Sequence, residues 1–120
     1  MQIAQTVKML SALAQESRLA IFRLLVEQGP EGLPVGTIGE TLGIPNATLS
    51  FHLKELLYAG LVTSRQSGRF VYYAPVIEAM NDLVGYLTEN CCQGQSCARP
   101  ATRTSKPRTA TTSRTRRRAT

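Results

Sequence analysis

Residues 42–62 read LGIPNATLSFHLKELLYAGLV, and they carry the clearest signal of the fold. Its start predicts a tight corner, because Gly43 accepts a left-handed conformation and Pro45 cannot continue a helix. The helix that follows ends at Gly60, and its leucines at positions 49, 53 and 56 fall within about 40° of one another on a helical wheel. The opposite face carries Ala47, Phe51, Lys54 and Tyr58. We therefore expect an amphipathic helix that buries its leucines and turns the other face outward.

The flanking regions predict a small, mainly helical domain. Apolar residues at helical spacing, in several cases followed by Gly or Pro, indicate four further helices. They cover residues 1–14, 16–28, 35–42 and 75–89, and residues 29–34 are expected to form a loop. Between residues 61 and 74 the pattern favours strands, and Ser67-Gly68 interrupts it as the turn of a hairpin. A helix, a turn, a second helix and a hairpin make a winged helix-turn-helix, so the expected fold class is mainly α with a small β-hairpin wing.

Charge is spread unevenly over the 120 residues. Residues 1–98 hold six Lys/Arg and eight Asp/Glu, whereas residues 99–120 hold eight Lys/Arg and no acidic residue. The two parts therefore carry net charges of −2 and +8, which add up to the +6 of the whole chain. The second part is rich in Arg, Thr, Ser and Pro, and it is expected to be disordered because it has almost nothing apolar to bury.

Composition also excludes several classes of protein. No apolar run approaches the about 18 residues of a membrane span, so no membrane partner is expected. The N-terminus lacks the basic stretch and apolar block of a secretory signal, and three clustered cysteines are too few to cross-link a secreted fold. We therefore expect a cytoplasmic protein with reduced thiols. A catalytic function is not expected, because the chain has no glycine-rich phosphate loop, no nucleophile elbow and a single histidine.

The outward face of the helix after Pro45 carries candidates for contact with double-stranded DNA. An α-helix fits the major groove of B-DNA, where base edges present a readable pattern. Asn46, Thr48 and Ser50 are short polar residues that can reach bases or phosphates, although such residues also serve as helix caps. Arg65 and Arg69 flank the hairpin tip, where they can meet phosphate or the minor groove.

Together these segments resemble the ArsR family of metal-responsive repressors. The resemblance covers residues 1–90 in order. It rests on residues 42–53, Leu56, Ala59-Gly60-Leu61-Val62 and Gly68-Arg69-Phe70-Val71-Tyr72-Tyr73, with Leu13-Ala14 and Arg18-Leu19-Ala20-Ile21 in the first two helices. It implies a homodimeric winged-helix repressor that leaves its operator DNA on binding a metal or metalloid. A second copy would also cover an apolar stripe larger than one small core needs, namely Ile3, Val7, Leu10, Val84 and Leu87.

The resemblance also implies which residues contact the operator. Asn46, Thr48, Ser50 and His52 match recognition-helix positions used for DNA, and Lys54, Arg65 and Arg69 complete the candidate set. The position after Ser50 is often Arg in the family and is Phe51 here, which can touch a thymine methyl group instead of a phosphate. His52 stands beside the leucine stripe, so a hydrogen bond inside the protein and a contact with DNA are both open.

Three cysteines, Cys91, Cys92 and Cys97, follow the last predicted helix and are the candidate inducer ligands. Many arsenic-responsive members of the family carry cysteines before the recognition helix, but residues 35–40 contain none. Three thiols within seven residues suit trivalent arsenic or antimony, because soft thiolates select soft, three-coordinate ions. Structural zinc normally needs four ligands, and the single histidine lies 39 residues before Cys91. Another thiophilic metal, a redox switch and the absence of any role remain alternatives.

The sequence thus predicts three parts and one function. Residues 1–90 form the DNA-binding and dimerisation domain, residues 91–98 the inducer-binding segment, and residues 99–120 a basic tail. The expected function is a repressor of arsenic-resistance genes that arsenite or antimonite releases from DNA and that needs no other cofactor. The alternative is a constitutive, sequence-tolerant DNA-binding or architectural protein whose basic tail supplies the affinity for phosphates.

Overall fold

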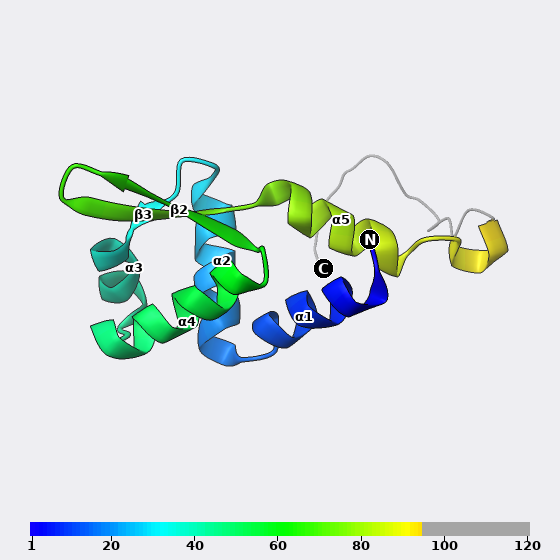
Figure 1. Cartoon of the computed structure of the whole chain (residues 1–120), viewed down its shortest axis with the longest axis horizontal. Coiled ribbons are helices and arrows are strands. Elements are labelled where there is room, and N and C mark those ends of the chain that lie inside the picture. Colours follow the sequence, from blue (N-terminus) through cyan, green and yellow to red (C-terminus); the bar gives the residue numbers. More distant parts are fainter. Residues whose placement is uncertain (95–120) are drawn as a thin grey trace, which may run out of the picture. The chain divides into compact units, whose positions relative to one another are not determined.

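Helices predominate in the computed structural model, which describes residues 1–94 of the chain. The α-helices are α1 (Ile3–Leu13), α2 (Glu16–Gln28), α3 (Val35–Leu42), α4 (Asn46–Tyr58) and α5 (Ile77–Leu87), and they belong to one compact unit, Met1–Leu87 (Figure 1). A short 3-10 helix, η1 (Cys91–Gly94), lies in a second unit that begins at Thr88. The predicted basic tail, residues 99–120, falls outside the described residues. No helix in the described range is long and apolar enough to cross a membrane.

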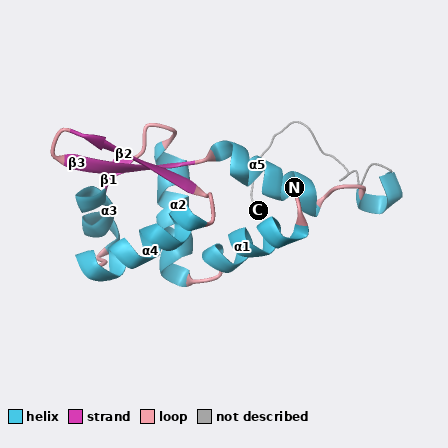
Figure 2. Cartoon of the chain, viewed as in Figure 1, coloured by secondary structure: helices cyan, strands magenta, loops and turns pink. Residues whose placement is uncertain are grey.

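A three-stranded antiparallel sheet forms the wing. Strands β2 (Val62–Ser67) and β3 (Phe70–Pro75) make the predicted hairpin (Figure 2). Its turn is Gly68-Arg69, one residue later than the predicted Ser67-Gly68, because Ser67 pairs with Phe70 and Gly68 takes the positive φ of 63°. The sheet order is β1-β3-β2, and β1 (Leu33–Pro34) pairs with Tyr72 and Tyr73. The prediction of a loop over residues 29–34 is therefore wrong for Leu33 and Pro34, which form a strand. The free edge of β3 offers backbone partners that residues distant in sequence can use, and periodicity cannot reveal such a pairing.

The helix-turn-helix forms as the sequence predicts. Helix α3 ends at Gly43, which has the left-handed φ of 67°, and α4 begins directly after Pro45. The two helices approach closely at Gly39, where a Cβ atom would lie 3.2 Å from a methyl group of Leu49. A side chain at position 39 would therefore require its neighbours in this tight corner to shift by a few tenths of an ångström.

The predicted leucine stripe of α4 lies in the core. Leu49 and Leu56 have no exposed surface and Leu53 is 1% exposed, and they pack with apolar residues of other elements. The fully buried side chains are Met9, Ile21, Leu25, Ile38, Leu49, Leu53, Leu56, Leu61 and Val62. Helix α4 is thus held by its buried face, while the opposite face stays exposed.

Replacing Leu49 by Ala should lower the free energy of unfolding by about 2–5 kcal/mol, because it leaves a cavity where α3 and α4 pack. The matched control is Leu57→Ala on the same helix, where the parent side chain is 38% exposed and the loss should be much smaller. Equilibrium unfolding in urea measures both values. Equal losses in the two variants would contradict the packing described for α4.

Candidate nucleic-acid interface

The outward face of α4 carries the short polar side chains that the sequence singles out. Asn46, Thr48 and Ser50 are all exposed, in the first part of the helix. The N-cap position is occupied by Pro45, so none of the three serves as the N-cap. Their polar groups are therefore available to base edges or phosphates. Phe51 is 56% exposed, which suits contact with an apolar group outside the chain.

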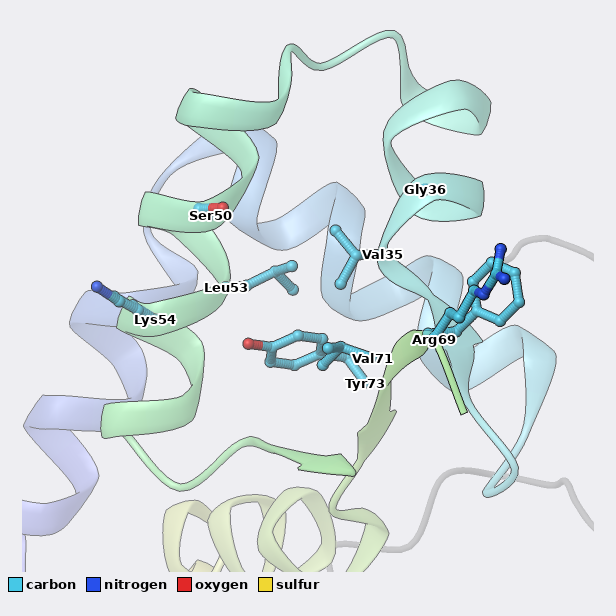
Figure 3. Close-up of a pocket in the computed structure, with 9 residues that line it drawn as sticks. Val35, Gly36, Ser50, Leu53, Lys54, Arg69, Val71 and Tyr73 are labelled. Carbon is cyan, nitrogen blue, oxygen red and sulfur yellow. The ribbon is translucent and has the colours of Figure 1, made fainter. Parts of the chain in front are cut away.

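A hollow of about 430 Å³ lies between α3, α4 and the wing (Figure 3). Apolar side chains of Val35, Leu53 and Val71 line it, and Figure 3 shows the Tyr73 hydroxyl pointing toward α4. The remaining lining residues are Gly36, Ser50, Lys54, Arg69 and Phe70. The fold thus brings three predicted DNA-contacting residues, one hydroxyl and two cations, from α4 and the hairpin tip to one concave surface.

Arg65 has a different setting from Arg69. Its Nη2 donates a hydrogen bond to the Glu31 carbonyl oxygen at 2.9 Å, and its guanidinium lies 4.5 Å from the centre of the Tyr72 ring. Both contacts tie strand β2 to neighbouring backbone and to β3. Arg65, which pairs with Tyr72 in the middle of the hairpin, therefore links the wing to the backbone just before β1, a role that sequence reasoning missed because Glu31 lies 34 residues away.

His52 lies on the buried side of α4, with 7% of its surface exposed. Its Nδ1 is 3.4 Å from Nη1 of Arg18, so the imidazole is turned toward α2 and not toward the outward face. The expectation that His52 contacts DNA is therefore corrected to the internal hydrogen bond that the sequence left open. Burial lowers the pKa of His52 from its usual 6.5, the charge of Arg18 lowers it further, and Glu55 opposes this shift. Neutral imidazole is the form that can accept a hydrogen bond from a guanidinium.

Stability should decrease below about pH 6.5 partly because of this histidine. The unfolded chain protonates His52 near its usual pKa of 6.5, whereas the folded protein does so only at lower pH. The unfolded state therefore binds more protons as the pH falls, and the free energy of unfolding decreases through that window. Urea unfolding of the parent and of His52→Asn at about pH 7.5 and pH 5 tests this. The Asn variant should lose less stability on acidification, and an equal loss in both proteins would contradict the prediction.

Two of the three predicted inducer ligands lie in the described residues. Cys91 and Cys92 belong to η1, and their sulfur atoms are 3.6 Å apart. Asn90, Cys92 and Gln93 have φ values of 56–58°, a conformation that costs non-glycine residues roughly 1–2 kcal/mol each. Cys97 lies outside the described residues, within which no group of three or more metal-binding side chains gathers. Cys91 and Cys92 are both disulfide-bonded in this structure, which differs from the reduced thiols that the sequence predicts, and the ligand roles of all three cysteines stay predictions.

The apolar stripe predicted for a second copy is exposed on the surface of α1 and α5. Figure 1 shows these helices on the side of α2 opposite α3. The exposed fractions are 69% for Ile3, 55% for Val7, 41% for Leu10, 55% for Val84 and 59% for Leu87. Exposed apolar side chains that gather on a surface often mark an interaction site, so these residues of α1 and α5 are a candidate interface.

Known proteins resemble this chain over its helix-turn-helix. Residues 13–65 match a family model described as a helix-turn-helix domain. The HTH-type transcriptional regulator YceK of Bacillus subtilis is 46% identical over 61 residues, which cover 51% of this chain and 60% of YceK. The arsenical resistance operon repressor of the same bacterium is 36% identical over 81 residues, 68% of this chain and 73% of that protein. The transcriptional activator HlyU of Vibrio cholerae is 31% identical over 90 residues, 75% of this chain and 81% of HlyU.

The chain does not span the full length of all these relatives. It covers 60% of YceK and 63% of the nodulation protein NolR from Rhizobium meliloti. Among solved structures, an ArsR-like transcriptional regulator from Rhodococcus sp. RHA1 shares the fold at a TM-score of 0.66 and 23% identity, over 76% of this chain and 83% of that one. The homodimeric winged helix-turn-helix domain of Mb0332 from Mycobacterium bovis matches at a TM-score of 0.59 and 27% identity, over 81% of this chain and 90% of that one.

Proposed function

The chain belongs to the ArsR family of winged-helix transcriptional regulators, and on that premise we propose that it is a homodimeric repressor released from operator DNA by trivalent arsenic. Members of this family regulate transcription and are not enzymes. The observation that carries the DNA-binding part is the hollow that Ser50 and Lys54 of α4 line together with Arg69 of the hairpin tip. A major-groove helix and a wing contact adjacent parts of the duplex, and these residues supply hydroxyl and cationic groups to its phosphates.

Dimerisation would present two such surfaces to an inverted repeat. The exposed stripe of α1 and α5 and the homodimeric state given for Mb0332 both support a second copy at that face. Two-fold symmetry would place the recognition helices about 34 Å apart, one turn of DNA. The operator is therefore expected to contain two half-sites in opposite orientation.

Asn46 and Arg69 should make different contributions to operator binding. Asn46→Ala should relax sequence preference by about 1–3 kcal/mol at one base pair in each half-site, the value of a bidentate contact with a base. Arg69→Ala should weaken binding to all sequences and reduce the salt slope by about one, as expected for a phosphate contact. The control is Arg23→Ala, which removes an exposed arginine that pairs with Glu27 on α2. Fluorescence anisotropy with operator and scrambled duplexes measures both effects, and unchanged binding by Asn46→Ala would refute its role.

The inducer part of the proposal rests on the cysteines. Cys91 and Cys92 are adjacent in η1 with sulfur atoms 3.6 Å apart, and once reduced to thiolates they would supply two of the three bonds that trivalent arsenic forms. Cys97 follows five residues after Cys92 and would supply the third bond. The related arsenical resistance operon repressor supports arsenic and repression, while the related HlyU is named a transcriptional activator, so the direction of regulation also needs a test.

The basic tail supports the alternative of a sequence-tolerant DNA-binding protein. The described residues contain six Lys/Arg, and four of these make contacts within the chain: Lys8, Arg18, Arg23 and Arg65. Lys54 and Arg69 line the hollow at the DNA-facing side. The eight positive charges of residues 99–120 would therefore outnumber them in contacts with phosphate.

One experiment separates these functions. The full chain selects a binding sequence from a random duplex library, and anisotropy then follows its release by arsenite, antimonite, zinc or a thiol oxidant. Selection of an inverted repeat and release by arsenite at stoichiometric concentration would support the proposal. Binding that ignores sequence and disappears when residues 99–120 are deleted would establish the alternative. Release by zinc or the oxidant, with arsenite inactive, would overturn the choice of inducer.

A further inference from the structure

Arg18 connects three helices through one side chain. At the start of α2 its backbone N–H is capped by the Gln15 side chain at 2.9 Å. Its Nε donates to the Ala12 carbonyl oxygen in α1 at 2.7 Å, and its Nη1 lies 3.4 Å from Nδ1 of His52 in α4. A planar guanidinium can hold two acceptors in a fixed geometry, which an ammonium group cannot do.

The other end of α1 is also joined to α4. Gln5 Nε2 donates to the Ala59 carbonyl oxygen at 3.2 Å, and Lys8 Nζ lies 4.3 Å from the centre of the Tyr58 ring. Helix α1 is therefore held to the C-terminal end of α4 directly and to its middle through Arg18. Apolar surfaces can slide past one another, whereas directional polar contacts at two points define one relative position.

These contacts connect the dimerisation surface on α1 with the DNA-contacting surface on α4 of the proposed repressor. Helix α1 carries exposed Ile3, Val7 and Leu10, and α4 carries exposed Asn46 and Ser50. The position of α1 in the dimer determines where each α4 lies relative to its partner, provided that the two helices move together. The contact between Arg18 and His52 makes the middle of α4 move together with α1.

We propose that Arg18 and His52 are positioning residues that lock the recognition helix to the dimerisation helix and thereby set the affinity for the operator. This inference rests on the proposed DNA-binding function. A shift of α1 at the dimer interface is then transmitted to α4 through the contact between Arg18 and His52. Loss of that contact leaves the fold and the dimer in place but lets the spacing of the two recognition helices vary.

The contact also makes operator binding sensitive to acid. Two further charged groups lie near the pair. Glu55 on α4 raises the pKa of His52 and so works against the effect of burial and Arg18, and Lys8 of α1 lines a pocket of about 350 Å³ together with Arg18 and Glu55. A protonated imidazole no longer offers Nδ1 as an acceptor and carries the same charge as the guanidinium. Protonation of His52 therefore separates the pair.

Three variants of the full chain test the role of this pair. His52→Leu removes the acceptor, and Arg18→Lys keeps the charge without the planar fork. His52→Asn keeps an acceptor oxygen near the position of Nδ1 and does not titrate, so it is the conservative rescue. Arg23→Lys, on the exposed side of the same helix, is the matched control. The readouts are operator affinity by anisotropy between about pH 7.5 and pH 5.5, dimer content by ultracentrifugation and helix content by circular dichroism.

At about pH 7.5, His52→Leu and Arg18→Lys should bind the selected operator roughly tenfold more weakly than the parent, while remaining folded dimers. His52→Asn and Arg23→Lys should bind like the parent. On acidification the parent should lose more affinity than His52→Asn. Parent-like binding by folded His52→Leu and Arg18→Lys, or identical pH profiles for parent and His52→Asn, would overturn the inference. Failure of the parent itself to bind any selected operator would instead refute the proposed function.

Discussion

Arsenite should release the parent protein from its operator and leave the Cys91→Ser, Cys92→Ser and Cys97→Ser variants bound. Thiolates are the ligands, and each substitution removes one of the three bonds that trivalent arsenic requires. The parent should lose operator affinity by roughly 5–150-fold on binding arsenite, the usual range of coupling between two sites. Each serine variant should retain the affinity of the arsenite-free parent. Gln93→Ser, a substitution between the same cysteines, is the control that should still respond.

Two further measurements make this prediction specific. Operator DNA should weaken arsenite binding by the same factor by which arsenite weakens operator binding, because coupling between equilibrium binding sites is reciprocal. Arsenite binding near neutral pH should also release protons, because free cysteine has a pKa of about 8.5. If all three serine variants dissociate from DNA like the parent, the cysteines are not the sensor.

Charges placed on the α1 and α5 stripe should abolish tight operator binding. Val7 and Leu87 are 55% and 59% exposed, and replacing both by Glu would bury four carboxylates in the proposed dimer. The protein should then be monomeric at micromolar concentration. Operator affinity should fall by roughly 100-fold or more, because a monomer contacts one half-site and loses the gain from linked binding.

Ultracentrifugation and anisotropy on the same samples test this link between assembly and DNA binding. Gln28→Glu is the control, because it adds a carboxylate at the end of α2 and outside the stripe. Circular dichroism should show unchanged helix content, since both replaced side chains are already largely exposed in the single chain. A Val7→Glu, Leu87→Glu protein that remains dimeric would locate the interface elsewhere.

Local sequence signals were sufficient for most of the fold. Helix α3 runs over Val35–Leu42, as its spacing and the following Gly43 predict. The leucines of α4 are buried, and the hairpin turns at Gly68. Each of these features depends on a period of 3.6 or two residues, or on a glycine that accepts a positive φ. Such properties are encoded within a few neighbouring residues.

The outward face of α4 was equally predictable, but the role of single residues was not. Periodicity places Ser50 and His52 close to the edge of the leucine stripe, where small rotations decide between solvent and core. The structure exposes Ser50 and buries His52 against Arg18. That choice depends on an arginine from another helix, which is 34 residues away in the sequence.

The sequence alone determined the helices, the hairpin, the buried and outward faces of α4 and the family. Three contacts depend on tertiary packing: Leu33–Pro34 joins β3, Arg65 binds the Glu31 carbonyl, and Arg18 links α1 to His52. Helical and strand periods arise from contacts between near neighbours, so they can be read from a short segment. Hydrogen bonds between distant residues arise only when packing brings a donor to an acceptor, and no local pattern records which partner that will be.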